Sequence, residues 1–146
     1  YIAEFLQKQW SDLGVKVVLE VNQASTHREM IDKGIASFFR ASWLGDYPDP
    51  ENYLSLFYSK NFTPAGPNKC HYKNPVFDKL YEKAIMETDD EKRNALYSKL
   101  DQIIMDDSPV IILFYDEIIR LTQPYVKGLE VNAMNTISLE RVDIEK

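Results

Sequence analysis

The residues best suited to chemistry lie in one short segment, ASWLGDYPDPENYL, at residues 41 to 54. It contains an indole at Trp43 and carboxylates at Asp46 and Asp49, with Gly45 directly before the first carboxylate. A glycine permits close approach of a ligand, an indole provides an apolar wall, and a carboxylate pairs with a primary ammonium group. The same residues also fit an indole in the core and an aspartate in a turn. The residues alone therefore leave both interpretations open.

Metal binding is poorly supported by the pattern of possible ligands. Counted from Asp46, a calcium loop would place Glu51 at its sixth position and Phe57 at its twelfth. Glycine and a bidentate glutamate are required at those positions, so the calcium interpretation fails at both. Cys70 and His71 are adjacent, whereas zinc ligands usually need two or more intervening residues to converge. We therefore expect no metal site.

Catalysis would depend on Cys70, because the chain shows no other arrangement typical of a nucleophile. A thiol nucleophile needs a base, which His71 or His27 could supply. A Gly-x-Ser-x-Gly elbow, a phosphate loop and a dinucleotide fingerprint do not occur. We predict no catalytic residues and no cofactor, and we keep a small Cys/His hydrolase as the alternative function.

The composition is typical of one globular unit, with 146 residues of which 45% are hydrophobic and 27% charged. A formal net charge of -6 argues against nucleic acid as a partner, because phosphate binding needs clustered Lys and Arg. No run of about 18 apolar residues occurs, so no membrane span is expected. The chain begins at Tyr1 without a capping residue before its first apolar stripe, which suggests that it starts partway along a longer protein.

The elements that must position segment 41–54 alternate between helix and strand. Helical spacing of apolar residues predicts a first helix over residues 1–13. Further helix starts are indicated by capping patterns at Thr26 with Glu29, Asp49 with Pro50, Asn74 with Pro75, and Thr88 with Glu91. Alternating or branched residues predict strands over 15–21, 36–43 and 110–122. This order predicts an α/β protein with helices packed on a sheet.

Four ordered motifs resemble a known family. They are Trp-x-x-Asp-Tyr-x-x-Pro at 43–50, Asn-Pro-x-Phe-Asp at 74–78, Asp-x-x-x-Arg-x-x-Leu-Tyr at 89–97, and Val-Lys-Gly at 126–128. Over nearly its whole length the chain resembles the C-terminal part of the family 5 extracellular solute-binding proteins of the oligopeptide and dipeptide type. The resemblance implies part of the second lobe of a type II periplasmic-binding-protein fold, a mixed sheet with packed helices. Residues 1–108 would form that lobe, and residues 109–146 would be strands returning across the hinge toward the first lobe.

The resemblance also implies a function and a site. The protein would capture oligopeptides or dipeptides for an ABC importer outside the cytoplasmic membrane, in the periplasm or as a cell-surface lipoprotein. Its partners would be the peptide, the transporter permease and the N-terminal lobe of the same full-length protein. A receptor lobe of the same fold without a role in transport is a second alternative.

The residues expected to meet the peptide lie on both sides of Trp43. In the family an aspartate at the position of Asp46 commonly pairs with the α-ammonium group of the peptide. Backbone groups of Ser42, Trp43 and Leu44 would pair with the extended ligand like an added strand. Arg40 would meet the ligand carboxylate, and an exposed guanidinium on a strand is the equal alternative for this residue.

Overall fold

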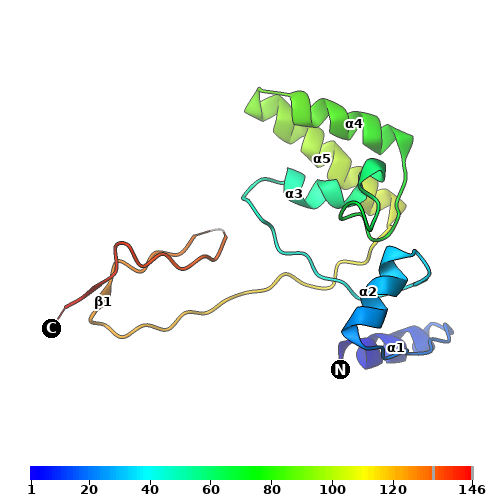
Figure 1. Cartoon of the computed structure of the whole chain (residues 1–146), viewed down its shortest axis with the longest axis horizontal. Coiled ribbons are helices and arrows are strands. Elements are labelled where there is room, and N and C mark those ends of the chain that lie inside the picture. Colours follow the sequence, from blue (N-terminus) through cyan, green and yellow to red (C-terminus); the bar gives the residue numbers. More distant parts are fainter. Residues whose placement is uncertain (133, 146) are drawn as a thin grey trace.

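The computed structural model describes residues 1–132 and 134–145, in which helices come first and a short β-hairpin comes last (Figure 1). The helices are α1 (Ile2–Asp12), α2 (Ala24–Asp32), α3 (Glu51–Leu54), α4 (Pro75–Met86) and α5 (Asp90–Asp107). Single turns of 3-10 helix follow α3 at Ser55–Phe57 and Ser59–Asn61. Strands β1 (Val126–Lys127) and β2 (Asp143–Ile144) pair antiparallel, with Val126 opposite Ile144. In this part of the chain no helix has the length and apolar character needed to cross a bilayer.

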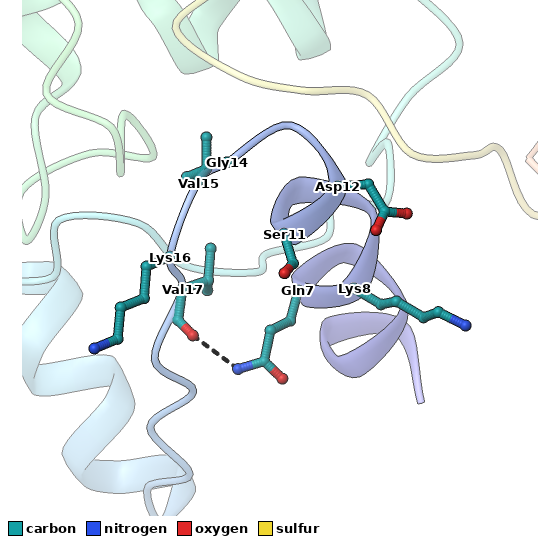
Figure 2. A pocket seen from close by; sticks show the side chains of 8 residues that line it. All are labelled: Gln7, Lys8, Ser11, Asp12, Gly14, Val15, Lys16 and Val17. Carbon is teal, nitrogen blue, oxygen red and sulfur yellow. Dashed lines mark hydrogen bonds between the residues drawn. The ribbon is translucent and has the colours of Figure 1, made fainter.

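The N-terminal helix α1 ends where the sequence predicts. Gly14 follows it with a φ of +80°, a left-handed conformation that glycine adopts without steric cost. The chain then folds back along the helix, and Gln7 Nε2 donates a 2.8 Å hydrogen bond to the carbonyl oxygen of Val17 (Figure 2). This bond lies at the edge of an open hollow between α1 and the segment after it. The hollow is lined mainly by polar and exposed side chains, so it lacks the features of a specific ligand site.

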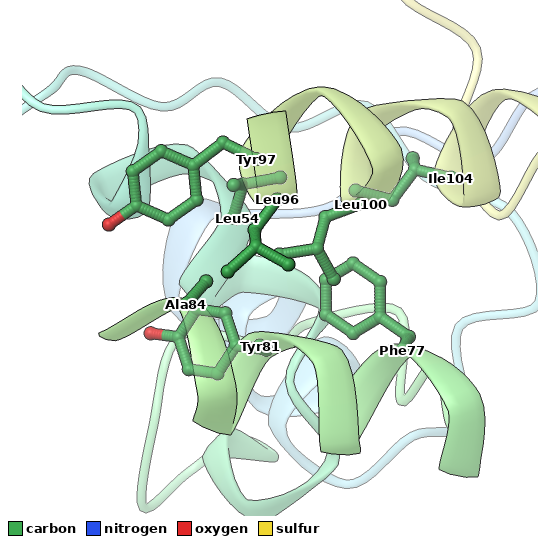
Figure 3. Packing of buried hydrophobic residues seen from close by; sticks show 8 residues of the cluster. All are labelled: Leu54, Phe77, Tyr81, Ala84, Leu96, Tyr97, Leu100 and Ile104. Atoms are coloured by element: carbon green, nitrogen blue, oxygen red, sulfur yellow. The ribbon is translucent and has the colours of Figure 1, made fainter. Parts of the chain in front are cut away.

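The apolar core lies between α3, α4 and α5 (Figure 3). Phe77 on α4 and Leu100 on α5 are fully buried, and burial of each such side chain contributes roughly 1.5 to 3 kcal/mol. The helical spacing on α4 and α5 brings their apolar faces together across this interface. The core consists of Leu54, Phe77, Tyr81, Ala84, Leu96, Tyr97, Leu100 and Ile104. The α5 members of this core therefore lie on one face of the helix, which packs against α3 and α4.

Asn74 caps α4 as predicted, whereas Asp49 lies one residue before the N-cap of α3, which is Pro50. The Asn74 Oδ1 atom accepts hydrogen bonds from the backbone N–H groups of Val76 at 2.9 Å and Phe77 at 3.3 Å. The Asp49 Oδ1 atom accepts from the backbone N–H of Glu51 at 2.9 Å. Each bond satisfies a donor at a helix N-terminus that has no partner within the helix. The Asx-Pro pattern therefore located the start of α4 correctly and that of α3 one residue too early.

The other two predicted capping patterns are misplaced. The cap of α5 is Asp89, not Thr88, and its carboxylate accepts from the backbone N–H of Lys92 at 3.1 Å. A carboxylate also interacts favourably with the positive end of the helix dipole, which favours it over a hydroxyl. Helix α2 begins at Ala24, before Thr26, with no side-chain cap. The helix therefore starts two residues before the predicted cap, Thr26.

The three segments predicted as strands have no partners in the part of the chain that the structure describes. Residues 15–21, 36–43 and 110–122 lie outside helices and take part in no strand pairing there. A strand needs a neighbour for its backbone hydrogen bonds, unlike a helix, which satisfies its own. Many apolar side chains of these segments are exposed, including Val21, Ile119 and Leu121. These segments have the composition of strands but do not form the sheet expected for residues 15–21 and 36–43 within the described part of the chain.

Candidate ligand-binding segment

The side chain of Trp43 is directed toward α3 and is held there by a hydrogen bond. Its Nε1–H donates to Oδ1 of Asn52 at 2.7 Å. Asn52 is only 3% exposed, so water has little access to compete for this acceptor. The indole itself is half-buried. A half-buried indole N–H with a buried acceptor has one strongly preferred orientation.

Neighbouring residues of the segment also contact the first turn of α3. The Tyr47 hydroxyl donates to the carboxylate of Glu51, which also accepts from the hydroxyl of Tyr81 on α4. A Cβ atom placed on Gly45 would lie 3.4 Å from the ring of Tyr53, so that ring covers the glycine. Burial and the nearby Glu51 carboxylate raise the pKa of Tyr81, which stays neutral as a donor. Segment 42–47 is thus fixed to the helical core.

The side chains between these contacts are free. Ser42, Leu44 and Asp46 are exposed, and Leu44 is 83% exposed. These exposed positions alternate with the contact residues along segment 42–47, which lies outside helices and strands and bends at Asp46 and Tyr47. Among the residues that the structure describes, no hydrogen bond or ion pair occupies the Asp46 carboxylate or the exposed guanidinium of Arg40.

Trp43 and Asp46, which were expected to act together in one site, therefore have different surroundings. Trp43 is directed toward α3, whereas Asp46 is exposed to solvent. The indole is suited to support the backbone of the segment, and the carboxylate remains available for a cation.

Segment 42–47 is also connected to α5 through the turn that follows it. Nη2 of Arg93 lies 3.5 Å from Oδ2 of Asp49 and 3.1 Å from Oδ1 of Asp90. The Arg93 guanidinium also lies over the ring of Tyr97, 5.9 Å from its centroid. Burial is the main cause that raises the pKa of Tyr97, and the Asp49 carboxylate adds to the effect. The turn is consequently anchored to α5 as well as to α4.

The thiol of Cys70 lies in surroundings that oppose nucleophilic chemistry. It is half-buried and its Sγ lies 3.4 Å from Oδ1 of Asn68, and burial raises the pKa of the thiol. His71 Nε2 lies 3.0 Å from Oγ1 of Thr63, and His27 packs against a phenylalanine ring. A reactive thiol needs a lowered pKa and a base in contact, so this site lacks both. Within residues 1–132 and 134–145, no cluster of three or more possible metal ligands occurs.

Comparisons with known proteins identify the family. The profile described as bacterial extracellular solute-binding proteins, family 5 Middle, matches residues 1–64. The chain is 34% identical over 117 residues to the periplasmic oligopeptide-binding protein OppA of Salmonella typhimurium, covering 80% of this chain and 21% of that protein. It is 31% identical over 141 residues to the periplasmic murein peptide-binding protein MppA of Escherichia coli, covering 96% of this chain and 26% of that protein.

Solved structures agree with this assignment. The periplasmic binding protein DppA from Helicobacter pylori, in complex with the peptide STSA, matches with a TM-score of 0.67 and 31% identity. The match covers 73% of this chain and 21% of that chain. The chain belongs to the family 5 extracellular solute-binding proteins, and it spans between a fifth and about a quarter of the length of these relatives. The predicted α/β class, as part of a type II periplasmic-binding-protein fold, is thereby confirmed.

Proposed function

We propose that this chain is part of the peptide-capturing component of an ABC importer, acting outside the cytoplasmic membrane. OppA and MppA are named as periplasmic binding proteins for oligopeptides and murein peptides, which supports this proposal. The relative from Helicobacter pylori binds a tetrapeptide and is associated with an ABC transporter. The partners of the complete protein would be a peptide and the transporter permease, and it would perform no chemistry on the ligand.

The observation that carries the proposed site is an exposed carboxylate on a fixed segment. Asp46 is exposed, while residues on either side of it are held against α3. A carboxylate that need not be reorganised can form a charge-assisted hydrogen bond with the α-ammonium group of a peptide. The backbone of Ser42, Trp43 and Leu44 would pair with the extended ligand, and Arg40 would meet its carboxylate.

The proposed division of the chain places residues 1–108 in the second lobe and residues 109–146 in strands that return toward the first lobe. The path of the chain supports this division, because the segment after α5 leaves the helical core as a long arm (Figure 1). The apolar side chains of residues 110–115 and of Ile118 and Ile119 are exposed on this arm. Such side chains are normally covered in the assembled protein, and strands of the first lobe would cover them.

The test uses the complete gene product that contains this chain. Peptides that co-purify with it are identified by mass spectrometry, and the affinity for the peptide STSA is measured by calorimetry. Asp46→Ala should weaken binding by about 1.5 to 3 kcal/mol, because a charge-assisted hydrogen bond is lost. Asp101→Ala, which removes the same charge from an exposed position on α5, is the matched control. Unchanged affinity in Asp46→Ala would show that another group binds the ammonium.

A further inference from the structure

The first turn of α3 contacts segment 42–47 at regular intervals. Three successive residues of α3 each contact one residue of the segment. The contacted residues of the segment are two positions apart. The contacts are Asn52 with Trp43, Tyr53 with Gly45, and Glu51 with Tyr47. Side chains at the start of a helix point back toward its N-terminus, which directs this turn onto the chain that precedes it. Ser42, Leu44 and Asp46, which lie between the contacts, are exposed, and Tyr47 at the end of the segment is 45% exposed.

Asn52 differs from the other two contact residues because it is a buried polar residue. It is 3% exposed, whereas the ring of Tyr53 is 48% exposed. An indole N–H is a donor only, so it needs an acceptor when it is shielded from water. The Oδ1 atom of Asn52 supplies that acceptor at 2.7 Å. Loss of this acceptor would leave the indole N–H without a partner and remove the preference for its present orientation.

We propose that Asn52 is a positioning residue for the peptide site, which holds the Trp43 indole against α3 and so determines which face of segment 42–47 meets the ligand. The inference rests on the proposed function only in its assumption that the free face binds peptide. The chain bends at Asp46, three residues after Trp43, so the direction of this carboxylate depends on how the segment is held at the indole. Release of the indole from Asn52 would let the segment move on α3 and turn Asp46 away from the ligand. Asn52 therefore acts through Trp43 and has no ligand contact of its own.

The experiment is a double-mutant cycle in the complete gene product. Asn52→Leu removes the acceptor, Trp43→Phe removes the donor, and the double variant removes both. Ser55→Ala is the matched control, because it removes a 3.0 Å hydrogen bond to the carbonyl oxygen of Asn52 from the same helical region without touching the indole. Affinities are measured for the peptide STSA and for its N-acetylated form, which lacks the ammonium group.

Asn52→Leu is expected to weaken STSA binding roughly fivefold, the ratio that corresponds to one net hydrogen bond of about 1 kcal/mol. It should also reduce the preference for the free over the acetylated peptide. In the Trp43→Phe background the additional effect of Asn52→Leu should fall below about twofold, because the donor is already absent. Equal effects of Asn52→Leu in both backgrounds would overturn the proposal.

A second measurement separates this inference from the proposed function. In protein with ¹⁵N-labelled tryptophan, the Trp43 indole resonance is identified by its loss in Trp43→Phe. It should shift and exchange faster with water in Asn52→Leu but not in Ser55→Ala, and an unchanged resonance would refute the positioning role. If the wild-type protein fails to prefer the free peptide over the acetylated one, the proposed role of Asp46 is wrong, while the resonance still tests the role of Asn52.

Discussion

Replacement of Asn68 by leucine is expected to open the loop formed by residues 59–73. Asn68 is 0% exposed and its side chain bonds to groups from both ends of the loop. Its Nδ2 donates to the carbonyl oxygens of Tyr58 and Tyr72, both at 3.0 Å. Its Oδ1 accepts from the backbone N–H of Tyr72 at 3.2 Å. One buried amide therefore makes three hydrogen bonds to backbone groups at the two ends of the loop, of which the Tyr58 carbonyl oxygen also accepts from the N–H of Asn61.

The magnitude follows from the number of backbone groups that lose a partner. Leucine is larger than asparagine and has no polar atom, so all three backbone bonds are lost and the buried site is also overpacked. At about 1 kcal/mol for each net hydrogen bond, Asn68→Leu should destabilise this region by about 3 kcal/mol. The loss is large beside a typical domain stability of about 5 to 15 kcal/mol.

Hydrogen exchange at increasing urea concentration measures this effect locally, which matters because a protein with two lobes need not unfold in one step. The backbone amides of α4 and α5 should exchange through an opening whose free energy is lower in Asn68→Leu. Asn94→Leu makes the same replacement at an exposed position on α5 and should change little. A loss below about 1 kcal/mol at Asn68 would refute the hydrogen-bond accounting.

Two further predictions concern titratable groups near this loop. Burial and the carboxylate of Asp107 raise the pKa of Tyr72 from 10.0 to about 12. The stability that the neutral Tyr72 hydroxyl contributes is thus complete below pH 10 and is lost as the pH rises toward 12. Tyr72→Phe should therefore reduce the fall in the free energy of urea unfolding at alkaline pH. An unchanged fall would contradict this assignment. The raised pKa of the Cys70 thiol predicts slow alkylation by iodoacetamide at neutral pH and faster alkylation in urea, whereas rapid reaction of the folded protein would favour the hydrolase alternative.

The helical part of the fold was predictable because its determinants are local in the sequence. The cap at Asn74 and the apolar spacing from Leu96 to Ile104 each lie within a few turns of the helix that they define. The error at Thr88 arose because its neighbour Asp89 is an equally good cap by residue type and a better acceptor beside a helix dipole. Local patterns therefore locate a helix well and its first residue less well.

The candidate site was only partly predictable for a different reason. Trp43 and Asp46 are recognisable by their chemistry, whereas the residue types of Asn52 and Glu51 do not mark them as contacts of segment 42–47. Their position in the sequence could have indicated this role. Both residues lie in the first turn of the helix that follows Asp49 and Pro50, where side chains point back along the preceding chain. Which side of the segment faces that turn depends on packing in three dimensions, which residue types alone do not determine.

The contrast between complete helices and unpaired strands has a physical cause. Helices α4 and α5 satisfy their backbone groups internally and cover each other's apolar faces, so neither depends on distant parts of a protein. The segments at 15–21 and 110–122 need partner strands for both purposes and leave apolar side chains exposed. Segment 42–47 lies between these two situations, because α3 holds one of its faces and the other is uncovered. Under the proposed function, an extended peptide would supply the missing strand on this uncovered face.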